Sequence, residues 1–213
     1  NSIYTNAYFE QEEQKCHLWD DRDGYESFAY KDYGYIKSKS SVGTTFSIFG
    51  DPVKKVQRWG KKDEELGNIF ESDVPVLTRV LVDKYYETDD IPKGHHIVII
   101  DIEVSADGGF PNMFDADKEI TAIGLYDYFG SKYYSWVLNR HTKVTENPST
   151  EDTIIEFVQT EEELLSNFFL KWSEIKPTII TGWNTEKFDI PYLYRRSRKV
   201  LGEDIAKMMS PIG

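Results

Sequence analysis

The sequence has few of the features that define disulfide-stabilised, zinc-binding or membrane proteins. Its 213 residues include a single cysteine, Cys16, which excludes an internal disulfide and a zinc site built from several cysteines. No apolar run approaches the roughly 20 residues that a membrane-spanning helix requires, and the first residues lack the pattern of a secretory signal peptide. The sequence therefore predicts a protein of a reducing cytoplasm without membrane contact.

Positive charge is also scarce. The chain carries 25 Lys and Arg against 37 Asp and Glu, a net charge of −12 at pH 7. Residues 1–94 have a net charge of −5 and residues 95–213 a net charge of −7, so neither half is basic. This balance argues against a broad electrostatic groove for duplex DNA. It does not exclude an enzyme that holds the end of one strand through metal ions and base stacking.

The length fits one large domain or two small ones, and the hydrophobic content of 39% is ordinary for a globular protein. An acidic stretch with Pro and Gly, residues 87–94, is the expected boundary. Residues 1–94 are predicted to form a β-rich domain. Their expected elements are strands at 2–10 and 15–19, half-buried strands within 25–37, a strand at 44–49, and a helix at 76–85 after Pro75.

Residues 95–213 are expected to form an α/β unit. Residues 97–104 form a nearly continuous apolar run, typical of a strand buried on both faces. A hairpin is expected over 120–128 and 132–138, followed by an irregular segment at 139–152. Apolar spacing and a capping box predict a helix at 160–176. A short buried strand at 178–183, a helix from about Asp189 to Leu201, and a short final helix complete the unit.

The most informative segment is residues 101–103, Asp-Ile-Glu, which closes that apolar run. Side chains two positions apart on a strand point to the same side, so Asp101 and Glu103 are expected to lie together. Two adjacent carboxylates repel each other, and a bound cation removes that cost. Hard divalent ions such as Mg²⁺ or Mn²⁺ prefer oxygen ligands. Together with a third acid at Asp189, the pattern indicates a metal-dependent phosphoryl-transfer site. Phosphodiester cleavage is the first candidate reaction.

An alternative interpretation accompanies each acid, because carboxylates at strand ends also serve as loop residues and helix caps. The Asp-Ile-Glu segment alone does not decide between them. Its combination with residues 181–192, which hold Asp189 after a second short strand, favours the metal site, because ligand sites in open α/β sheets lie at such strand ends.

Two sets of segments resemble the exonuclease motifs of B-family DNA polymerases. Asp-Ile-Glu-Val at 101–104, Gly-Phe-Pro at 109–111 and Ile-Thr-Ala-Ile at 120–123 resemble the first motif. Thr-Gly-Trp-Asn at 181–184 and Phe-Asp-Ile-Pro-Tyr at 188–192 resemble the second. The similarity covers most of residues 95–210 and is strongest to polymerases of T-even-type bacteriophages. It implies a ribonuclease H-like mixed-sheet exonuclease domain, α/β in class and α+β overall, truncated at its end. Residues 1–94 match the family's N-terminal domain by position.

The resemblance implies 3′→5′ proofreading of an unpaired DNA 3′ end with two divalent ions, Mg²⁺ or Mn²⁺, in the cytoplasm of an infected bacterial host. Asp101 would bridge both ions. Glu103 would bind the ion that activates the attacking water, and Asp189 would hold the second ion directly or through water. These three residues are therefore both the expected metal ligands and the expected catalytic residues.

The resemblance also implies three substrate-binding residues. Phe110 and Phe188 match family aromatics that contact the terminal bases, and base stacking of this kind tolerates any sequence. A core position remains the alternative for Phe188, whereas Phe110, a loop residue between Gly and Pro, has little else to contact. Asn184 matches a position near the substrate, with capping of the local turn as its alternative.

The family's third motif, a Tyr followed by an Asp, has no match after Asp189. The chain therefore resembles an N-terminal piece of a polymerase, and we expect little or no exonuclease activity from it alone. The expected partners are a single-stranded DNA 3′ end and the remainder of the polymerase, in cis or as a separate chain. An alternative function is a non-catalytic module of a split polymerase that binds RNA or single-stranded DNA.

Overall fold

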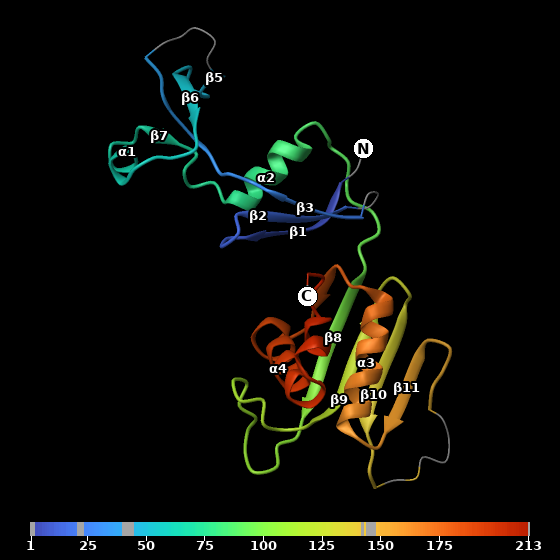
Figure 1. Ribbon diagram of the computed structural model, residues 1–213. Coiled ribbons are helices and arrows are strands. Elements are labelled where there is room, and N and C mark those ends of the chain that lie inside the picture. Colours follow the sequence, from blue (N-terminus) through green and yellow to red (C-terminus); the bar gives the residue numbers. More distant parts are fainter. Residues whose placement is uncertain (1–2, 21–23, 40–44, 142, 144–147, 213) are drawn as a thin grey trace. The chain divides into compact units, whose positions relative to one another are not determined.

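The computed structural model describes residues 3–20, 24–39, 45–141, 143 and 148–212 (Figure 1). Residue contacts divide the chain into two compact units, Asn1–Gly94 and His95–Gly213. The first unit contains two sheets and the second unit one, and each unit has its own buried cluster. Among the described helices, none has the length and apolar character needed to cross a membrane.

The first unit begins with a three-stranded antiparallel sheet and a helix. A hydrophobic cluster of Cys16, Leu18 and Val80 joins the sheet to the helix, and burial raises the pKa of the Cys16 thiol. This thiol is therefore the inert core group that a buried cysteine usually is. The elements are β1 (Tyr4–Glu10), β2 (Lys15–Asp20), β3 (Gly24–Ala29) and α2 (Val76–Tyr85), in the sheet order β1-β2-β3.

A small four-stranded sheet completes the first unit. Its strand order is β5-β6-β4-β7, with antiparallel pairing of the neighbours. The bounds are β4 (Gly34–Lys37), β5 (Thr45–Phe46), β6 (Pro52–Val56) and β7 (Ile69–Phe70), and a short helix, α1 (Lys61–Glu65), lies between β6 and β7.

The sequence predictions for the first unit are confirmed for β1, β2 and α2, and are corrected elsewhere. The aromatic alternation at 25–37 covers two strands, β3 and β4, which belong to different sheets. The strand expected at 44–49 is only β5, because residues 47–50 form a turn. The strands β6 and β7 and the helix α1 were not expected, since each is short and carries no clear periodicity. The expected starts at Ser2 and Thr44 lie outside the described residues.

The second unit is built on a five-stranded mixed sheet with the order β11-β10-β9-β8-β12. The strands β8, β9 and β10 pair antiparallel, whereas β11 lies parallel to β10 and β12 parallel to β8. Their bounds are β8 (Ile97–Val104), β9 (Ile120–Asp127), β10 (Lys132–Leu138), β11 (Thr153–Val158) and β12 (Ile179–Thr181). The strand β11 follows the irregular segment and was not expected.

Helices cover one face of this sheet, as Figure 1 shows for α3 and α4. Thr160 caps α3 by accepting a hydrogen bond from the Glu163 backbone N–H (3.1 Å), as its capping pattern predicted. The five apolar positions expected to face the core are all buried: Leu164, Leu165, Phe168, Phe169 and Trp172. The helical elements are α3 (Glu161–Ile175), a π-helical turn η1 (Thr185–Asp189), α4 (Ile190–Leu201) and α5 (Glu203–Lys207).

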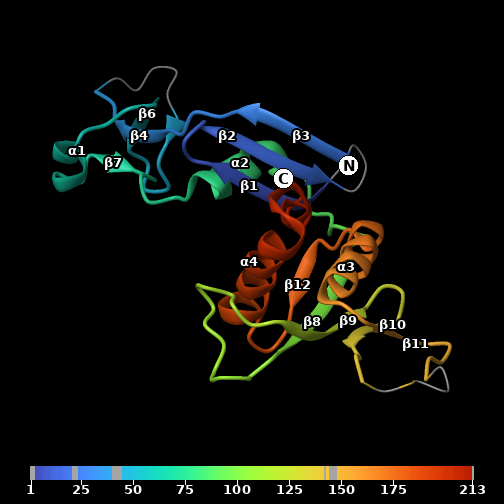
Figure 2. The same ribbon diagram turned by 60° about the horizontal axis from the view of Figure 1, so that its bottom comes forward.

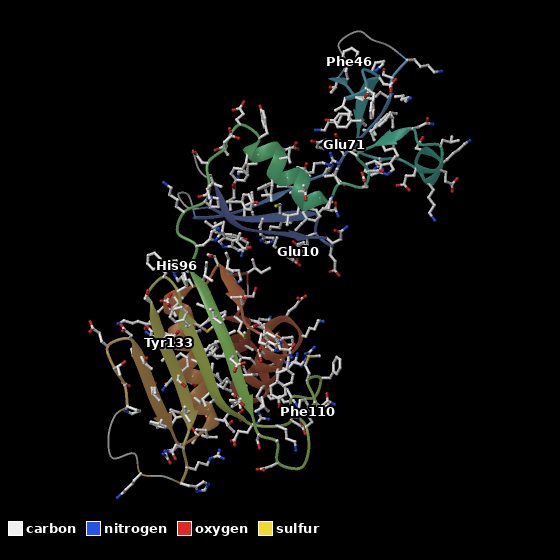
Figure 3. All side chains as sticks on the ribbon, turned by 180° about the vertical axis from the view of Figure 1, so that it is seen from behind. Glu10, Phe46, Glu71, His96, Phe110 and Tyr133 are labelled. Atoms are coloured by element: carbon white, nitrogen blue, oxygen red, sulfur yellow. The ribbon has the colours of Figure 1, made fainter. Side chains whose placement is uncertain are left out.

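The other face of the sheet is open, and this corrects two expectations. In β8 only Val98, Ile100 and Ile102 are buried, while alternate residues, including Ile99, are exposed. The strand is therefore buried on one face and not on two. The strand β12 is also not buried, because it is an edge strand of the sheet. Figure 3 shows the open face from behind, with Tyr133 on it.

Candidate active site

Asp101 and Glu103 lie side by side on the open face of β8. The burial of β8 alternates strictly over residues 98–103, and both acids occupy exposed positions. Their cross-strand neighbours on β9 are Gly124 and Ala122. Residues opposite each other in an antiparallel pair share a face, so the two smallest side chains stand beside the two carboxylates. This arrangement leaves the carboxylate oxygens accessible from the open face.

Asp189 approaches the pair from a different element. It ends η1, directly before α4, and β8 and η1 contact each other. Figure 2 shows β12, which leads into this segment, beside β8, with α4 following. Only 3% of the Asp189 surface is exposed, and its Oδ2 atom has no hydrogen-bond partner among the described residues. Burial raises the pKa of the Asp189 carboxyl, and the negative charges of Asp101 and Glu103 raise it further.

Gly182 allows the segment before η1 to approach β8 closely. A Cβ atom at this position would lie far inside the contact distance of the Ile100 carbonyl oxygen and of Thr185 Oγ1. Ile100 directly precedes Asp101 on β8, so the missing side chain lets the backbone pass beside the acid pair. The glycine in the Thr-Gly-Trp-Asn segment therefore has a packing role in placing η1 next to β8.

Two polar anchors hold α4, and with it Asp189, against the sheet. The Tyr192 hydroxyl donates to the Lys118 carbonyl (2.8 Å) and accepts from the Lys118 N–H (3.0 Å). The buried Glu161 carboxylate receives two hydrogen bonds from Arg196, at 2.8 and 2.7 Å, and one from the Ile120 N–H at 2.8 Å. These anchors were not identified from the sequence. Their only signal there was an acid in the first turn of α3, which also fits favourable interaction with the helix dipole.

Phe110 lies on the loop between β8 and β9, and Figure 3 shows its ring projecting at that end of the sheet. It is 90% exposed. The two preceding residues, Gly108 and Gly109, have φ values of +77° and +123°, conformations that favour glycine. The structure therefore presents this ring to solvent, as expected for a loop residue with nothing to pack against.

Asn184 and Phe188 have different surroundings. Among the described residues, the Asn184 side chain makes no hydrogen bond that caps the π-helical turn, and the residue is exposed. The Phe188 ring stacks on Tyr192, with 5.2 Å between ring centroids, and packs against the core cluster of the unit. Phe188 is only partly buried, so a core role and a surface role coexist at this residue.

Trp183 was not singled out from the sequence, although it lies within the quoted Thr-Gly-Trp-Asn segment. It is 100% exposed and lines an open cavity of about 610 Å³ together with Asn184. A fully exposed indole beside the candidate substrate residue extends the aromatic surface at this end of the sheet.

The chemistry of the three acids suits a divalent cation, although their arrangement is not a complete ligand set. In the part of the chain that the structure describes, no group of three Asp, Glu, His or Cys side chains lies close enough together to hold a metal ion. Asp189 nevertheless has a buried oxygen without a partner, and its carboxyl is coupled to two further carboxylates. A cation would compensate both costs, and all-oxygen donor sets suit Mg²⁺ and Mn²⁺.

A five-stranded mixed sheet with helices on one face, with acids on β8 and on the helical turn that follows β12, is consistent with an exonuclease domain of the ribonuclease H-like type. Residues 85–210 match the family model "DNA polymerase family B, exonuclease domain". The chain belongs to DNA polymerase family B.

Two phage proteins are among its curated relatives. It is 30% identical over 202 residues to the DNA-directed DNA polymerase of Escherichia phage RB69, a match that covers 81% of this chain and 22% of that protein. It is 32% identical over 133 residues to the DNA-directed DNA polymerase of Enterobacteria phage T4, with 53% of this chain and 15% of that protein covered. A DNA polymerase of Pyrococcus glycovorans is 29% identical over 133 residues, covering 62% of this chain and 15% of that protein. The chain thus spans about a fifth or less of their lengths.

Proposed function

We propose that the second unit supplies part of a two-metal 3′→5′ exonuclease site in a phage-type B-family DNA polymerase, which removes nucleotides from DNA 3′ ends. The observation that carries this proposal is Asp189, a buried carboxylate with an unpartnered oxygen, coupled electrostatically to Asp101 and Glu103. A buried charge without compensation costs free energy, and ionisable groups perturbed in this way cluster at functional sites.

Each carboxylate has a distinct position from which to act. Asp101, which lies where η1 comes close to β8, would contact both ions. Glu103, one pleat further along the open face, would hold the ion on the water side. Asp189 would hold the other ion from the end of η1. The two anchors of α4 keep its carboxylate in place. When bound, the two ions would stabilise the attacking and leaving oxygens of the phosphodiester.

The aromatic residues would bind the single-stranded 3′ end. Phe110 is free to stack on an unpaired base, and Asn184 presents its amide near the same end of the sheet. Phe188 would contribute the edge that its packing on Tyr192 leaves uncovered. Its position also supports α4, so we expect a substitution there to affect both stability and substrate binding.

Ion binding by the purified chain tests the proposal without requiring catalysis. Electron paramagnetic resonance of Mn²⁺ titrations should show bound ion for the unmodified chain and weaker binding for Asp101→Asn and for Asp189→Asn. The matched control is Asp152→Asn, an exposed acid at the start of β11, which should bind Mn²⁺ as the unmodified chain does. Equal binding by all four proteins would refute the proposed site.

The chain alone should show little or no exonuclease activity on single-stranded DNA, because three carboxylates from one strand and one helical turn would leave the cage around the ions incomplete. The remainder of a polymerase, in cis or as a separate chain, would complete the site in the cytoplasm of an infected host. Rapid Mg²⁺-dependent degradation by the purified chain, abolished by Asp101→Ala, would show that these residues suffice by themselves.

A further inference from the structure

The loop between β8 and β9 carries a second exposed aromatic ring, which the proposed exonuclease site does not use. Phe114 follows Phe110 by four residues and is 74% exposed. Single exposed apolar side chains are common on protein surfaces, so exposure alone gives Phe114 no function. Its contacts with the loop and with α4 decide whether the ring is placed to bind a ligand.

Hydrogen bonds hold the backbone around Phe114 in a defined shape. The Phe114 N–H donates to Asn112 Oδ1, and Asn112 Nδ2 donates to Asp115 Oδ2, both at 2.8 Å. The Asn112 side chain thus forms the local turn. The Ala116 N–H donates to the Asn112 carbonyl, also at 2.8 Å, and Ala116 is buried in the core cluster of the second unit. The chain is therefore fixed on both sides of Phe114, while the ring stays in solvent.

The loop is attached to α4, the helix that begins directly after Asp189. Figure 2 shows the loop passing beside this helix. The Lys199 ammonium donates to the Asp115 carbonyl, and the Arg196 guanidinium donates to the Ala116 carbonyl at 3.3 Å. Both carbonyls belong to the turn described above. The exposed ring is therefore held beside the helix that also places the Asp189 carboxylate.

Arg195, on the same helix, lies against the Phe114 ring. Its guanidinium carbon is 5.6 Å from the ring centroid, within the range of a cation–π contact. Arg195 follows Asp189 by six residues, about 9 Å along a helix axis. The ring and the guanidinium therefore lie a short way along α4 from the candidate metal ligand. Since the ring is largely exposed, this contact leaves part of its surface open to a stacking partner.

Arg195 carries a charge that no acid neutralises among the described residues. The helix α4 contains four basic residues and no acid. Two of its arginines have acidic partners, since Arg196 pairs with Glu161 and Arg198 lies 3.6 Å from Glu203. In the described part of the chain, by contrast, the buried Nη1 atom of Arg195 has no hydrogen-bond partner. A donor left unpaired in this way costs free energy, and an anion beside the guanidinium would supply the missing counter-charge.

We propose that Phe114 and Arg195 form a second subsite for the DNA strand, which binds the nucleotide one or two positions before the 3′ end. This inference rests on the proposed exonuclease function and names two further residues that bind its substrate. The base stacks on the open side of the Phe114 ring, as bases do on exposed aromatic platforms of any single-strand site. The Arg195 guanidinium binds a phosphate of the same strand, with the charge-assisted hydrogen bonds typical of arginine and phosphate.

The subsite determines how many nucleotides of a DNA end must be unpaired. A base within a duplex is stacked on its neighbours and cannot stack on Phe114. An end with one unpaired nucleotide therefore reaches Phe110 alone, whereas an end with three unpaired nucleotides reaches both rings. The longer unpaired end gains one stacked base and one phosphate contact.

Fluorescence anisotropy tests this with the whole purified chain in Mg²⁺ and labelled duplexes that carry a 3′ overhang of one or three thymidylates. We expect the unmodified chain to bind the longer overhang about tenfold more tightly, the gain of one stacked base. Phe114→Ala should abolish this difference, and Phe110→Ala should weaken both complexes alike. For the longer overhang, Arg195→Gln should reduce the slope of log affinity against log salt by about 0.7, the loss of one phosphate contact.

Matched variants separate a stacking role from a structural one. Phe114→Trp keeps a flat ring and should retain the preference for the longer overhang, whereas Phe114→Leu keeps an apolar side chain without a ring and should lose it. A ring that only supported the loop would tolerate leucine better than the larger tryptophan. Arg198→Gln removes a charge from the same helix and should leave the salt slope unchanged, because Glu203 already neutralises Arg198.

The outcomes distinguish this subsite from the exonuclease site as a whole. If neither overhang binds in Mg²⁺, the proposed function and the subsite both fail. If both overhangs bind equally well and Asp101→Asn weakens both, the exonuclease site stands and the subsite is overturned. A preference for the longer overhang that persists in Phe114→Ala, or that Phe114→Leu retains as well as Phe114→Trp, also overturns it.

Discussion

At the scale of single residues, Asp189 has the most unusual electrostatic environment among the three candidate acids of the second unit. Its carboxyl is buried, its Oδ2 atom lacks a partner among the described residues, and two further carboxylates raise its pKa beyond the effect of burial. Burying a carboxylate costs more than burying an amide of the same shape. The residue therefore destabilises the fold when no cation compensates its charge, and a cation bound there would reverse that effect.

The first prediction follows from this reversal. In EDTA, Asp189→Asn should make the chain about 1–2 kcal/mol more stable to denaturant, a typical range for one substitution. With saturating Mn²⁺ the unmodified chain should gain stability by mass action, and the variant should gain little. Urea unfolding followed by circular dichroism measures both quantities. Loss of stability in EDTA, together with an undiminished Mn²⁺ effect, would contradict the metal role of Asp189.

A second prediction concerns Gly182, where the backbone itself is the constraint. Gly182→Ala places a methyl group against the Ile100 carbonyl oxygen and Thr185 Oγ1, and overpacking of this kind costs about 1–3 kcal/mol. Gly124→Ala is the control, because a Cβ atom there meets nothing within 4 Å. Thermal unfolding should show a clear loss for the first variant and almost none for the second. Equal effects would mean that η1 can shift away from β8 without cost.

At the scale of elements, the pair of Glu161 and Arg196 fixes α4 against the start of α3. Removing one partner of a buried ion pair costs about 3–5 kcal/mol, so Arg196→Met should strongly destabilise the chain. Arg198→Met is the matched control on the same helix, because its partner Glu203 lies 3.6 Å away in a pair about half exposed, worth about 0–1 kcal/mol. Chemical denaturation of both variants measures the difference. A similar loss in both would show that the Glu161 pair has no special role.

The extent to which the elements follow from the sequence depends on how local their signals are. Apolar spacing and the Thr160 cap predict α3, and the apolar run and hairpin turn predict β8, β9 and β10. Local signals do not predict the strand β11, since it follows a polar segment and pairs parallel with β10. Local signals also do not predict the open face of β8, because an apolar run does not show whether other elements pack on both faces of the strand.

The candidate site divides in the same way. Alternation along a strand predicts that Asp101 and Glu103 share a side, and the structure places both on the open face. The burial of Asp189 cannot be read from its own segment, since it depends on contacts that η1 makes with β8 through the space left by Gly182. The clamp of Glu161 and Arg196 joins residues 35 positions apart, and neither has a local pattern that identifies the other.

At the scale of the whole molecule, the net charge of −12 opposes binding of any polyanion. The proposed exonuclease residues lie in a unit of net charge −7. Binding of a DNA 3′ end at the acids should therefore require divalent ions, which would offset the repulsion between the carboxylates and the phosphates.

The last prediction uses this metal dependence. An oligonucleotide with 2-aminopurine as its 3′-terminal base should change fluorescence on binding only when Mg²⁺ is present, because the acids otherwise repel the terminal phosphate. Phe110→Ala should weaken this signal about tenfold, the loss of one stacked base. Phe129→Ala, an exposed ring on the β9–β10 turn, should leave it unchanged. An equal signal in EDTA, or equal effects of the two Phe substitutions, would place the 3′ end away from Asp101 and Glu103. A second oligonucleotide carries 2-aminopurine as its 5′-terminal base. If Mg²⁺ does not change its fluorescence, the metal-dependent site recognises the 3′ end itself.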